Sequence, residues 1–118
     1  MMMNHYKEAS DIDVFVMRLL NPLDDEIFEL FMRAVDDEKK KEISAVKNKA
    51  VRDMKIVSRI FSGACIKKTF GINLKEQDFG YEEFGKPCLV NFPNIHFNVS
   101  HSNGVFVCAV GNAIVGVD

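Results

Sequence analysis

Residues 97–102 read F-N-V-S-H-S and form the densest group of polar side chains in the sequence. Ser100 offers a hydroxyl donor, and the imidazole of His101 can carry a positive charge near neutral pH. A hydroxyl, a cationic imidazole and the amides of a turn can converge on one anion, which favours phosphate binding. No G-x-S-x-G motif surrounds Ser100 or Ser102, so nucleophilic catalysis has little support. Taken alone, a Ser-His pair more often caps a turn.

Two further segments hold residues suited to a phosphate site. Residues 85–87 read G-K-P and predict a rigid turn that presents one ammonium group, since glycine permits unusual backbone angles and proline fixes the exit direction. Residues 116–118 read G-V-D and place the carboxylate of Asp118 at the end of an apolar strand. Such a carboxylate is costly unless it meets a cation or a metal. Mg²⁺ suits one or two carboxylates combined with substrate phosphates.

Positive charge is concentrated in the middle of the chain. Residues 39–68 hold ten Lys and Arg against two acids, a balance of +8. Residues 1–38 hold three basic and ten acidic groups (−7), and residues 69–118 hold two and five (−3). A compact positive region attracts polyanions such as phosphates or nucleic acid, although a solvated helix face is the commoner meaning of such a run.

Length and composition favour one small globular domain. The chain has 118 residues, of which 47% are hydrophobic, and a net charge of −2, which excludes a disordered tail. Its apolar runs are too short to span a bilayer. Cys65, Cys88 and Cys108 form no C-x-x-C pair, so neither a disulfide framework nor a structural zinc site is expected. Together with a polar N-terminus unlike a signal peptide, this predicts a cytoplasmic protein.

The apolar pattern of the first part of the chain predicts a strand followed by helices. The strand spans residues 12–20, one helix begins near Pro22, and a short helix spans residues 39–47. The clearest helix runs over residues 50–70, where apolar residues three and four apart form one stripe, and Gly71 ends it. The side chains that lie off this stripe present positive charge on another side of the helix: Arg52, Lys55 and Arg59.

After the long helix the pattern takes the two-residue period of strands. Strands are predicted at residues 95–100, 105–110 and 113–117, joined by tight turns. The fold class is therefore α+β, a short antiparallel β-meander packed against a long helix. We expect residues 1–10 to be disordered or an artificial chain end, and residues 11–118 to form the folded unit.

Taken in order, G-K-P (85–87), F-N-V-S-H-S (97–102) and G-V-D (116–118) resemble the first half of an Sfp-type 4′-phosphopantetheinyl transferase. The preceding basic helix corresponds as well, and the resemblance covers residues 10–118. F-N-x-S-H-S followed by G-V-D after one hairpin is fairly specific, whereas G-K-P alone is not. In this family two similar lobes hold the cofactor between them, so the resemblance implies that this chain is the N-terminal lobe.

The resemblance also implies an activity and a set of site residues. Family members use Mg²⁺ to transfer the 4′-phosphopantetheine arm of coenzyme A to a serine of an acyl or peptidyl carrier protein. By that similarity, the residues that bind coenzyme A are Arg52, Lys86, Pro87, Ser100 and His101, and the first metal ligand is Asp118. The family pattern continues after G-V-D with a hydrophobic residue and a glutamate, and a later K-E-(A/S)-x-x-K helix is absent here. We therefore assign no catalytic residue within this chain and expect it to be inactive alone.

Two other functions stay open. A lobe that associates with itself would bind coenzyme A or another polyphosphate without catalysis, because an unfinished last strand exposes an edge that invites pairing. Nucleic-acid binding by the basic helix ranks last, since no aromatic-interleaved basic surface accompanies the charge. The expected partners are a carrier protein and either a C-terminal lobe or a second copy of this chain, with no nucleic acid and no membrane.

Overall fold

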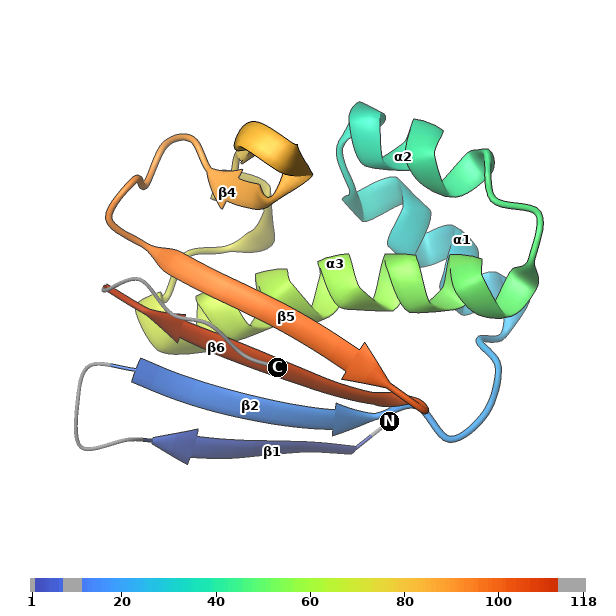
Figure 1. Ribbon diagram of the computed structural model, residues 1–118, viewed down its shortest axis with the longest axis horizontal. Coiled ribbons are helices and arrows are strands. Elements are labelled where there is room, and N and C mark those ends of the chain that lie inside the picture. The colour runs from blue at the N-terminus through green and yellow to red at the C-terminus, as the bar shows by residue number, and fades with distance from the viewer. Residues whose placement is uncertain (1, 8–11, 113–118) are drawn as a thin grey trace.

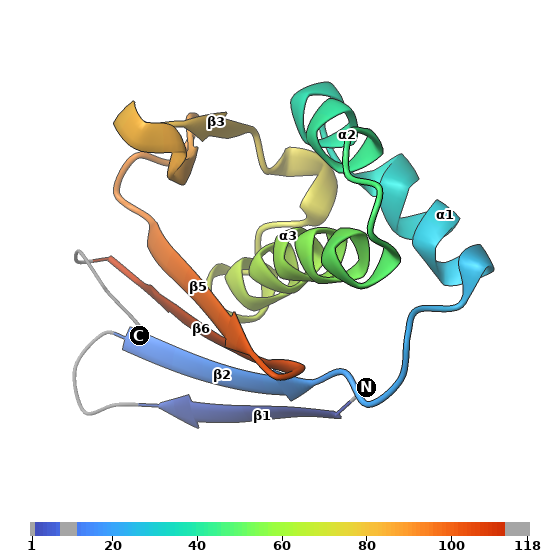
Figure 2. The same cartoon turned by 45° about the vertical axis from the view of Figure 1, so that its right-hand side comes forward.

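The computed structural model describes residues 2–7 and 12–112, and these form an α+β fold around an antiparallel sheet. The sheet has four strands in the order β1-β2-β6-β5 (Figure 1). The strands are β1 (Met2–Lys7), β2 (Ile12–Arg18), β5 (His96–Ser102) and β6 (Val105–Gly111). Figure 2 shows the helices and a small second sheet of β3 (Phe79–Tyr81) and β4 (Pro87–Leu89) on one side of the main sheet. The predicted fold class is confirmed.

Three helices precede the second sheet, and polar caps set where each begins. Asp24 caps α1 (Asp25–Ala34) by accepting the amide of Glu26, so this helix begins after Pro22 rather than at it. Asp36 caps α2 (Asp37–Ser44), and Asn48 caps α3 (Lys49–Phe70), which ends at Gly71 with a φ of 74°. Two single turns of 3₁₀ helix, η1 (Leu74–Glu76) and η2 (Glu83–Gly85), follow. No helix within the described ranges is both long enough and apolar enough to cross a membrane.

The core lies between α3 and the inner face of the main sheet. Alternation along β2 and β6 turns Phe15 and Phe106 inward, and both side chains are fully buried. Phe106 meets Phe61 of α3 edge to face, with the ring centroids 6.4 Å apart. Burial of an aromatic side chain of this size stabilises a fold by about 2 to 3 kcal/mol. The buried residues that α3 adds to this layer are Ile56, Val57, Phe61, Cys65 and Ile66.

The thiols of Cys65 and Cys108 meet in this layer. Cys65 lies on α3, Cys108 lies on β6, and both side chains are fully buried and free of disulfide bonds. The hydrogen bond from Cys108 raises the pKa of the Cys65 thiol well above its usual range, and burial adds to the effect. The two residues therefore act as small core side chains rather than as reactive thiols.

The sheet differs from the predicted meander in the neighbour of β6. The hairpin of β5 and β6 is confirmed, and β2 pairs along the other side of β6, from Ile12 opposite Gly111 to Arg18 opposite Val105. The predicted strand at residues 113–117 lies outside the described residues. Residues 1–10 were expected to be disordered or an artificial chain end; within them, Met2–Lys7 form β1, which pairs with β2 along its whole length.

The turn between β5 and β6 depends on a glycine. Asn103 and Gly104 have φ values of 51° and 77°, as a type I′ hairpin requires. A Cβ atom on Gly104 would lie 2.8 Å from the carbonyl oxygen of Leu19, whose amide donates to the Gly104 carbonyl at 2.8 Å. Both the backbone angle and the space at this position therefore exclude a side chain.

We expect Gly104→Ala to lower the free energy of unfolding by about 2 to 3 kcal/mol, as measured by urea denaturation. Gly71→Ala is the matched control, because Gly71 has a similar φ of 74° but no atom within 4 Å of the added Cβ. This control should cost only about 1 kcal/mol, from backbone strain alone. Equal losses in the two variants would show that the contact with Leu19 has no effect.

Candidate functional site

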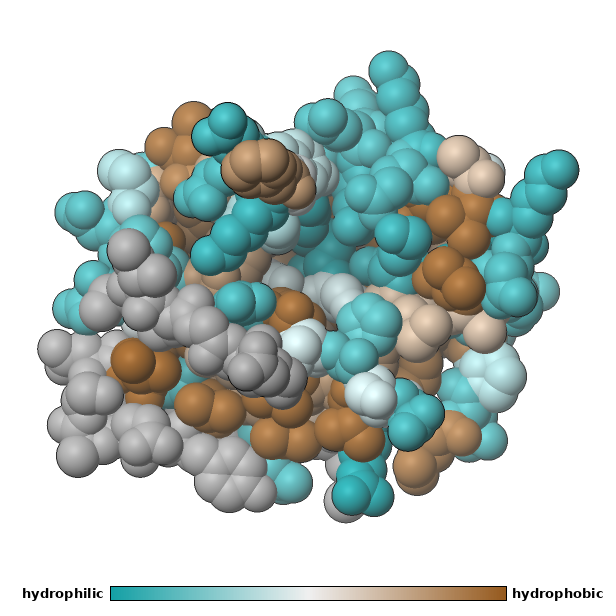
Figure 3. Space-filling view, viewed as in Figure 1, coloured by the Kyte–Doolittle hydropathy of each residue, from teal (hydrophilic) through white to brown (hydrophobic). Residues whose placement is uncertain are grey.

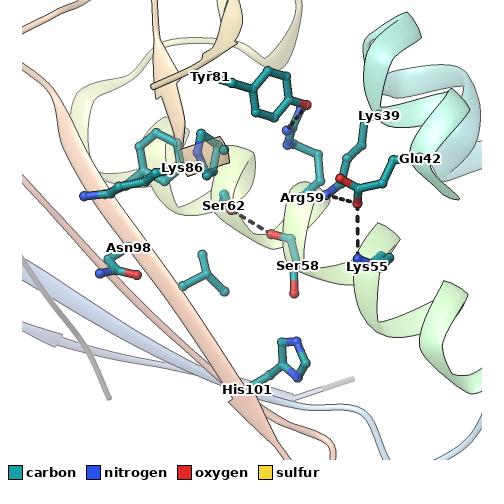
Figure 4. A pocket seen from close by; sticks show the side chains of 14 residues that line it. Lys39, Glu42, Lys55, Ser58, Arg59, Ser62, Tyr81, Lys86, Asn98 and His101 are labelled. Carbon is teal, nitrogen blue, oxygen red and sulfur yellow. Dashed lines mark hydrogen bonds and ion pairs between the residues drawn. The ribbon is translucent and has the colours of Figure 1, made fainter. Parts of the chain in front are cut away.

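A cavity of about 240 Å³ opens between α2, α3, β5 and the turn that leads into β4. Figure 3 shows hydrophilic residues around this hollow above α3, and Figure 4 shows the side chains that line it. The long helix contributes Lys55, Ser58, Arg59 and Ser62, which follow one another at helical spacing and therefore share one face. The remaining lining comes from Lys39 and Glu42 of α2, Tyr81, Gly85, Lys86, Pro87, Phe97, Asn98, Val99 and His101.

Positive charge dominates the cavity. Four cationic side chains line it (Lys39, Lys55, Arg59 and Lys86), together with one carboxylate. That carboxylate belongs to Glu42, and its Oε2 atom accepts from Lys39 Nζ at 2.9 Å and from Lys55 Nζ at 3.4 Å. Partial burial acts to raise the pKa of Glu42, but the hydrogen bonds and charges of the two lysines outweigh it and hold the pKa below its usual value. Glu42 is therefore ionised at neutral pH.

Arg59 is buried in the wall of the cavity, although the sequence placed it on an exposed face of the helix. Its Nη1 forms an ion pair with Asp36, its Nη2 donates to the Tyr81 hydroxyl at 2.8 Å, and that hydroxyl donates to Asp36 Oδ2 at 3.4 Å. The guanidinium also lies 4.2 Å from the centroid of the Phe79 ring. Burial contributes most to the raised pKa of Tyr81. This network joins β3 to α2 and α3, and it explains how a cation can be buried here.

The G-K-P turn and the end of β5 face the same cavity, so Lys86, Pro87 and His101 lie around one space. Phe84 and Gly85 have φ values of 68° and 80°, and the tight turn that they form is followed by Lys86, which lines the cavity on the side opposite α2 with its ammonium group pointing away from Glu42 (Figure 4). The ring of His101 is exposed and lies 5.4 Å from the ring of Phe106. Three of the side chains that the motifs single out are thus brought together.

The other predicted site residues lie elsewhere. Ser100 is half-buried and pairs with Val107, and strand alternation places it on the opposite face of β5 from His101. Arg52 lies over the ring of Phe28, 5.3 Å from its centroid, on the side of α3 that faces α1 rather than in the cavity lining. Asp118 lies outside the described residues.

The structure places no metal site among the residues that it describes. Within residues 2–7 and 12–112, no three His, Cys, Asp or Glu side chains gather closely enough to hold an ion. The metal ligand that the sequence predicts, Asp118, is not one of these residues.

Sequence reasoning missed Lys39, Glu42 and Ser58 as parts of the site. Lys39 falls within the basic segment of residues 39–68, but charge alone does not show which lysines of that segment lie around one cavity. Ser58 lies one helical turn after Lys55, and its buried Oγ atom has no hydrogen-bond partner within the described part of the chain. Helical spacing from Lys55 was the signal that could have identified Ser58 and Arg59 as neighbours at one site.

Comparisons with known proteins show which family the chain belongs to. A family model described as "4′-phosphopantetheinyl transferase, N-terminal" matches residues 20–113, which include the G-K-P turn, the F-N-V-S-H-S strand and all the helices. The chain belongs to the 4′-phosphopantetheinyl transferase family. The match to the N-terminal model also places this 4′-phosphopantetheinyl transferase segment in the first part of the family fold.

Curated 4′-phosphopantetheinyl transferases are similar to much of the chain. It is 28% identical over 97 residues to 4′-phosphopantetheinyl transferase Sfp of Bacillus subtilis (strain 168), covering 82% of this chain and 43% of that protein. A second 4′-phosphopantetheinyl transferase of Bacillus subtilis is 31% identical over 87 residues, covering 74% of this chain and 39% of that protein. 4′-Phosphopantetheinyl transferase gsp of Aneurinibacillus migulanus is 28% identical over 107 residues, covering 91% and 44%. The chain thus spans about two fifths of the length of these relatives.

Proposed function

We propose that the chain is the N-terminal lobe of a cytoplasmic enzyme that transfers the 4′-phosphopantetheine arm of coenzyme A to a serine of an acyl or peptidyl carrier protein. The observation that carries this proposal is the shared cavity. Lys86 and His101 come from two separate motifs, and they meet Lys39, Lys55 and Arg59 from the basic helices around one space. Coenzyme A carries a diphosphate and a ribose phosphate, so it matches a site that is rich in cations.

The chemistry of this transfer explains why such a site is needed. The serine oxygen of the carrier protein attacks the phosphorus that bears the pantetheine arm, and the bond from that phosphorus to the bridging oxygen of the diphosphate breaks. Adenosine 3′,5′-bisphosphate leaves, and the serine proton passes to a base. Negative charge grows on the leaving phosphate, and fixed cations around it stabilise the transition state. Lys86, held on a rigid turn, and the lysines of α2 and α3 are the groups that we assign to this task.

The rest of the active site is expected at Asp118, which lies outside the described residues, and in a second lobe. By family resemblance, Asp118 contributes one ligand for Mg²⁺, and the second lobe contributes the other carboxylate and a lysine. When bound, Mg²⁺ would neutralise charge on the diphosphate. Since the chain spans about two fifths of its relatives, we expect it to bind coenzyme A weakly and to show no transfer without the second lobe.

The test measures transfer in the full-length protein that contains this chain, supplied with coenzyme A, Mg²⁺ and an apo carrier protein. We expect modification of the carrier serine, detected by intact mass, and a loss of about tenfold to a hundredfold in kcat/KM for Lys86→Ala. Lys75→Ala is the control, because Lys75 lies in η1 and is not part of the cavity lining.

Three outcomes separate the alternatives. Equal loss in the two lysine variants would contradict the role of the cavity. Binding of coenzyme A without transfer would favour the non-catalytic, self-associating polyphosphate-binding module. If the protein neither binds coenzyme A nor transfers its phosphopantetheine arm, the proposed function is wrong.

A further inference from the structure

We propose that Glu42 is a resident anion of the cavity, which competes with the ligand for two lysines and thereby sets the affinity of the site for phosphates. This inference rests on the proposed function, because it concerns the same cavity. It assigns a specificity role to a residue that belongs to none of the three sequence motifs. The role follows from where the carboxylate lies and from what holds it there.

A single oxygen of Glu42 bridges two helices. Its Oε2 atom accepts from Lys39 Nζ at 2.9 Å, three residues back on α2, and from Lys55 Nζ at 3.4 Å on α3 (Figure 4). The contact with Lys39 has the length at which an ammonium group holds a phosphate oxygen, and the contact with Lys55 is longer and weaker. The carboxylate therefore occupies a position that an oxygen of an anionic ligand would take between the same two lysines.

The bridge can be displaced. The Glu42 side chain is 43% exposed and that of Lys55 is 38% exposed, so water and salt screen the pair. Ion pairs of this exposure contribute little net stability, and a glutamate has enough rotatable bonds to turn toward solvent. A phosphate carries more charge than the carboxylate and can accept from both lysines at once, so it would replace Glu42 at modest cost.

Glu42 is not needed to hold the lysines in the cavity. The Lys39 side chain is only 15% exposed and is already packed, and Lys55 stands in the second turn of a 22-residue helix. A bound phosphate would instead meet a like charge close to it, because Glu42 stays on the same turn of α2 when it gives up the lysines. Like charges at a binding site lower affinity, so the net effect of Glu42 is to weaken binding.

This competition has a consequence for turnover. Coenzyme A and adenosine 3′,5′-bisphosphate carry the same ribose phosphate and share one phosphate of the diphosphate, so a cavity that binds the substrate tightly also retains the product. A carboxylate that weakens both interactions favours product release. Its removal should therefore lower both KM and the dissociation constant of the product, without a matching rise in kcat.

The experiment compares Glu42→Gln with the parent in the full-length protein by isothermal titration calorimetry. The probes are coenzyme A, adenosine 3′,5′-bisphosphate and inorganic pyrophosphate, each at low and high salt. Asp37→Asn is the matched control, because Asp37 lies on the same helix, loses the same charge, is 95% exposed and is not part of the cavity lining. We expect Glu42→Gln to bind each probe about fivefold more tightly at low salt, with a smaller gain at high salt, and Asp37→Asn to match the parent.

A second variant, Glu42→Ala, guards against an effect of the glutamine side chain and should shift affinity in the same direction. Unchanged or weaker binding in both Glu42 variants would overturn the inference, and so would an equal gain in Asp37→Asn. The pyrophosphate titration separates the two proposals. If the parent binds pyrophosphate but not coenzyme A, the proposed function fails. The ratio of the pyrophosphate dissociation constants of the parent and the Glu42 variants then still decides the role of Glu42. If no variant binds any probe, both proposals are overturned.

Discussion

Arg59→Ala is expected to lower the free energy of unfolding by about 3 to 4 kcal/mol, a larger loss of stability than for Gly104→Ala. The change removes a guanidinium whose side chain is only 5% exposed, and it leaves Asp36 without the cation that faces it. It also removes a hydrogen bond to Tyr81 and the stacking on Phe79. Because these partners belong to α2 and β3, the packing of both elements against α3, which forms one wall of the cavity, should weaken as well.

Urea denaturation followed by circular dichroism measures this loss. Arg59→Lys keeps the charge but cannot reach Asp36 and the Tyr81 hydroxyl with one planar group, so it should recover only part of the stability. Tyr81→Phe removes a single hydroxyl and should cost about 1 kcal/mol. An Arg59→Ala variant that unfolds within 1 kcal/mol of the parent would show that the network does not support β3.

The double variant Lys39→Ala, Lys55→Ala is expected to weaken coenzyme A binding by about fiftyfold, the largest loss of affinity. Each lysine alone should cost less than half of this in free energy, because the remaining lysine can still bind the phosphate once it leaves Glu42. The change removes two of the four cationic side chains that line the cavity. Titration calorimetry at low and high salt measures this loss of affinity. The affinity of the double variant for coenzyme A should also depend less steeply on salt than that of the parent.

The control for this variant is Lys40→Ala, Lys68→Ala. These lysines lie on the same two helices, carry the same charge and are not part of the cavity lining. If the control loses as much affinity as the cavity variant, the attraction is a general effect of the basic segment rather than of the site. An unchanged affinity in the cavity variant would place the phosphates of coenzyme A elsewhere.

Local patterns were enough to predict the fold class. The apolar stripe over residues 50–70 specified α3 almost to the residue, and Gly71 ended it as expected. The pairing of β2 with β6 could not be predicted, because it joins segments about 90 residues apart whose alternation fits several neighbours equally well. The helix starts were missed for a smaller reason, since Asp24 and Asp36 act as caps outside the periodic pattern.

The site was predictable only where a single turn or strand defines it. Lys86, Pro87 and His101 line the cavity because the turn and the end of β5 fix their direction. Ser100 shows a limit of motif reading, since adjacent residues of a strand point to opposite faces, and here His101 lines the cavity while Ser100 does not.

Arg59 shows a second limit of sequence reasoning. Helical periodicity cannot reveal that Asp36 and Tyr81, 23 residues before it and 22 residues after it, make its burial possible.

Because Cys65 and Cys108 contact each other between α3 and the sheet, their accessibility to a thiol reagent measures how often the helix separates from the sheet. Both side chains are buried between α3 and β6, so a reagent cannot reach them while the helix is packed on the sheet. Cys88 in β4 is free and only half-buried, so we expect it to react from the folded state and to serve as the reference. The rate at which a thiol reagent modifies Cys65 and Cys108 therefore reports how often α3 separates from β6, and no residue has to be substituted to measure it.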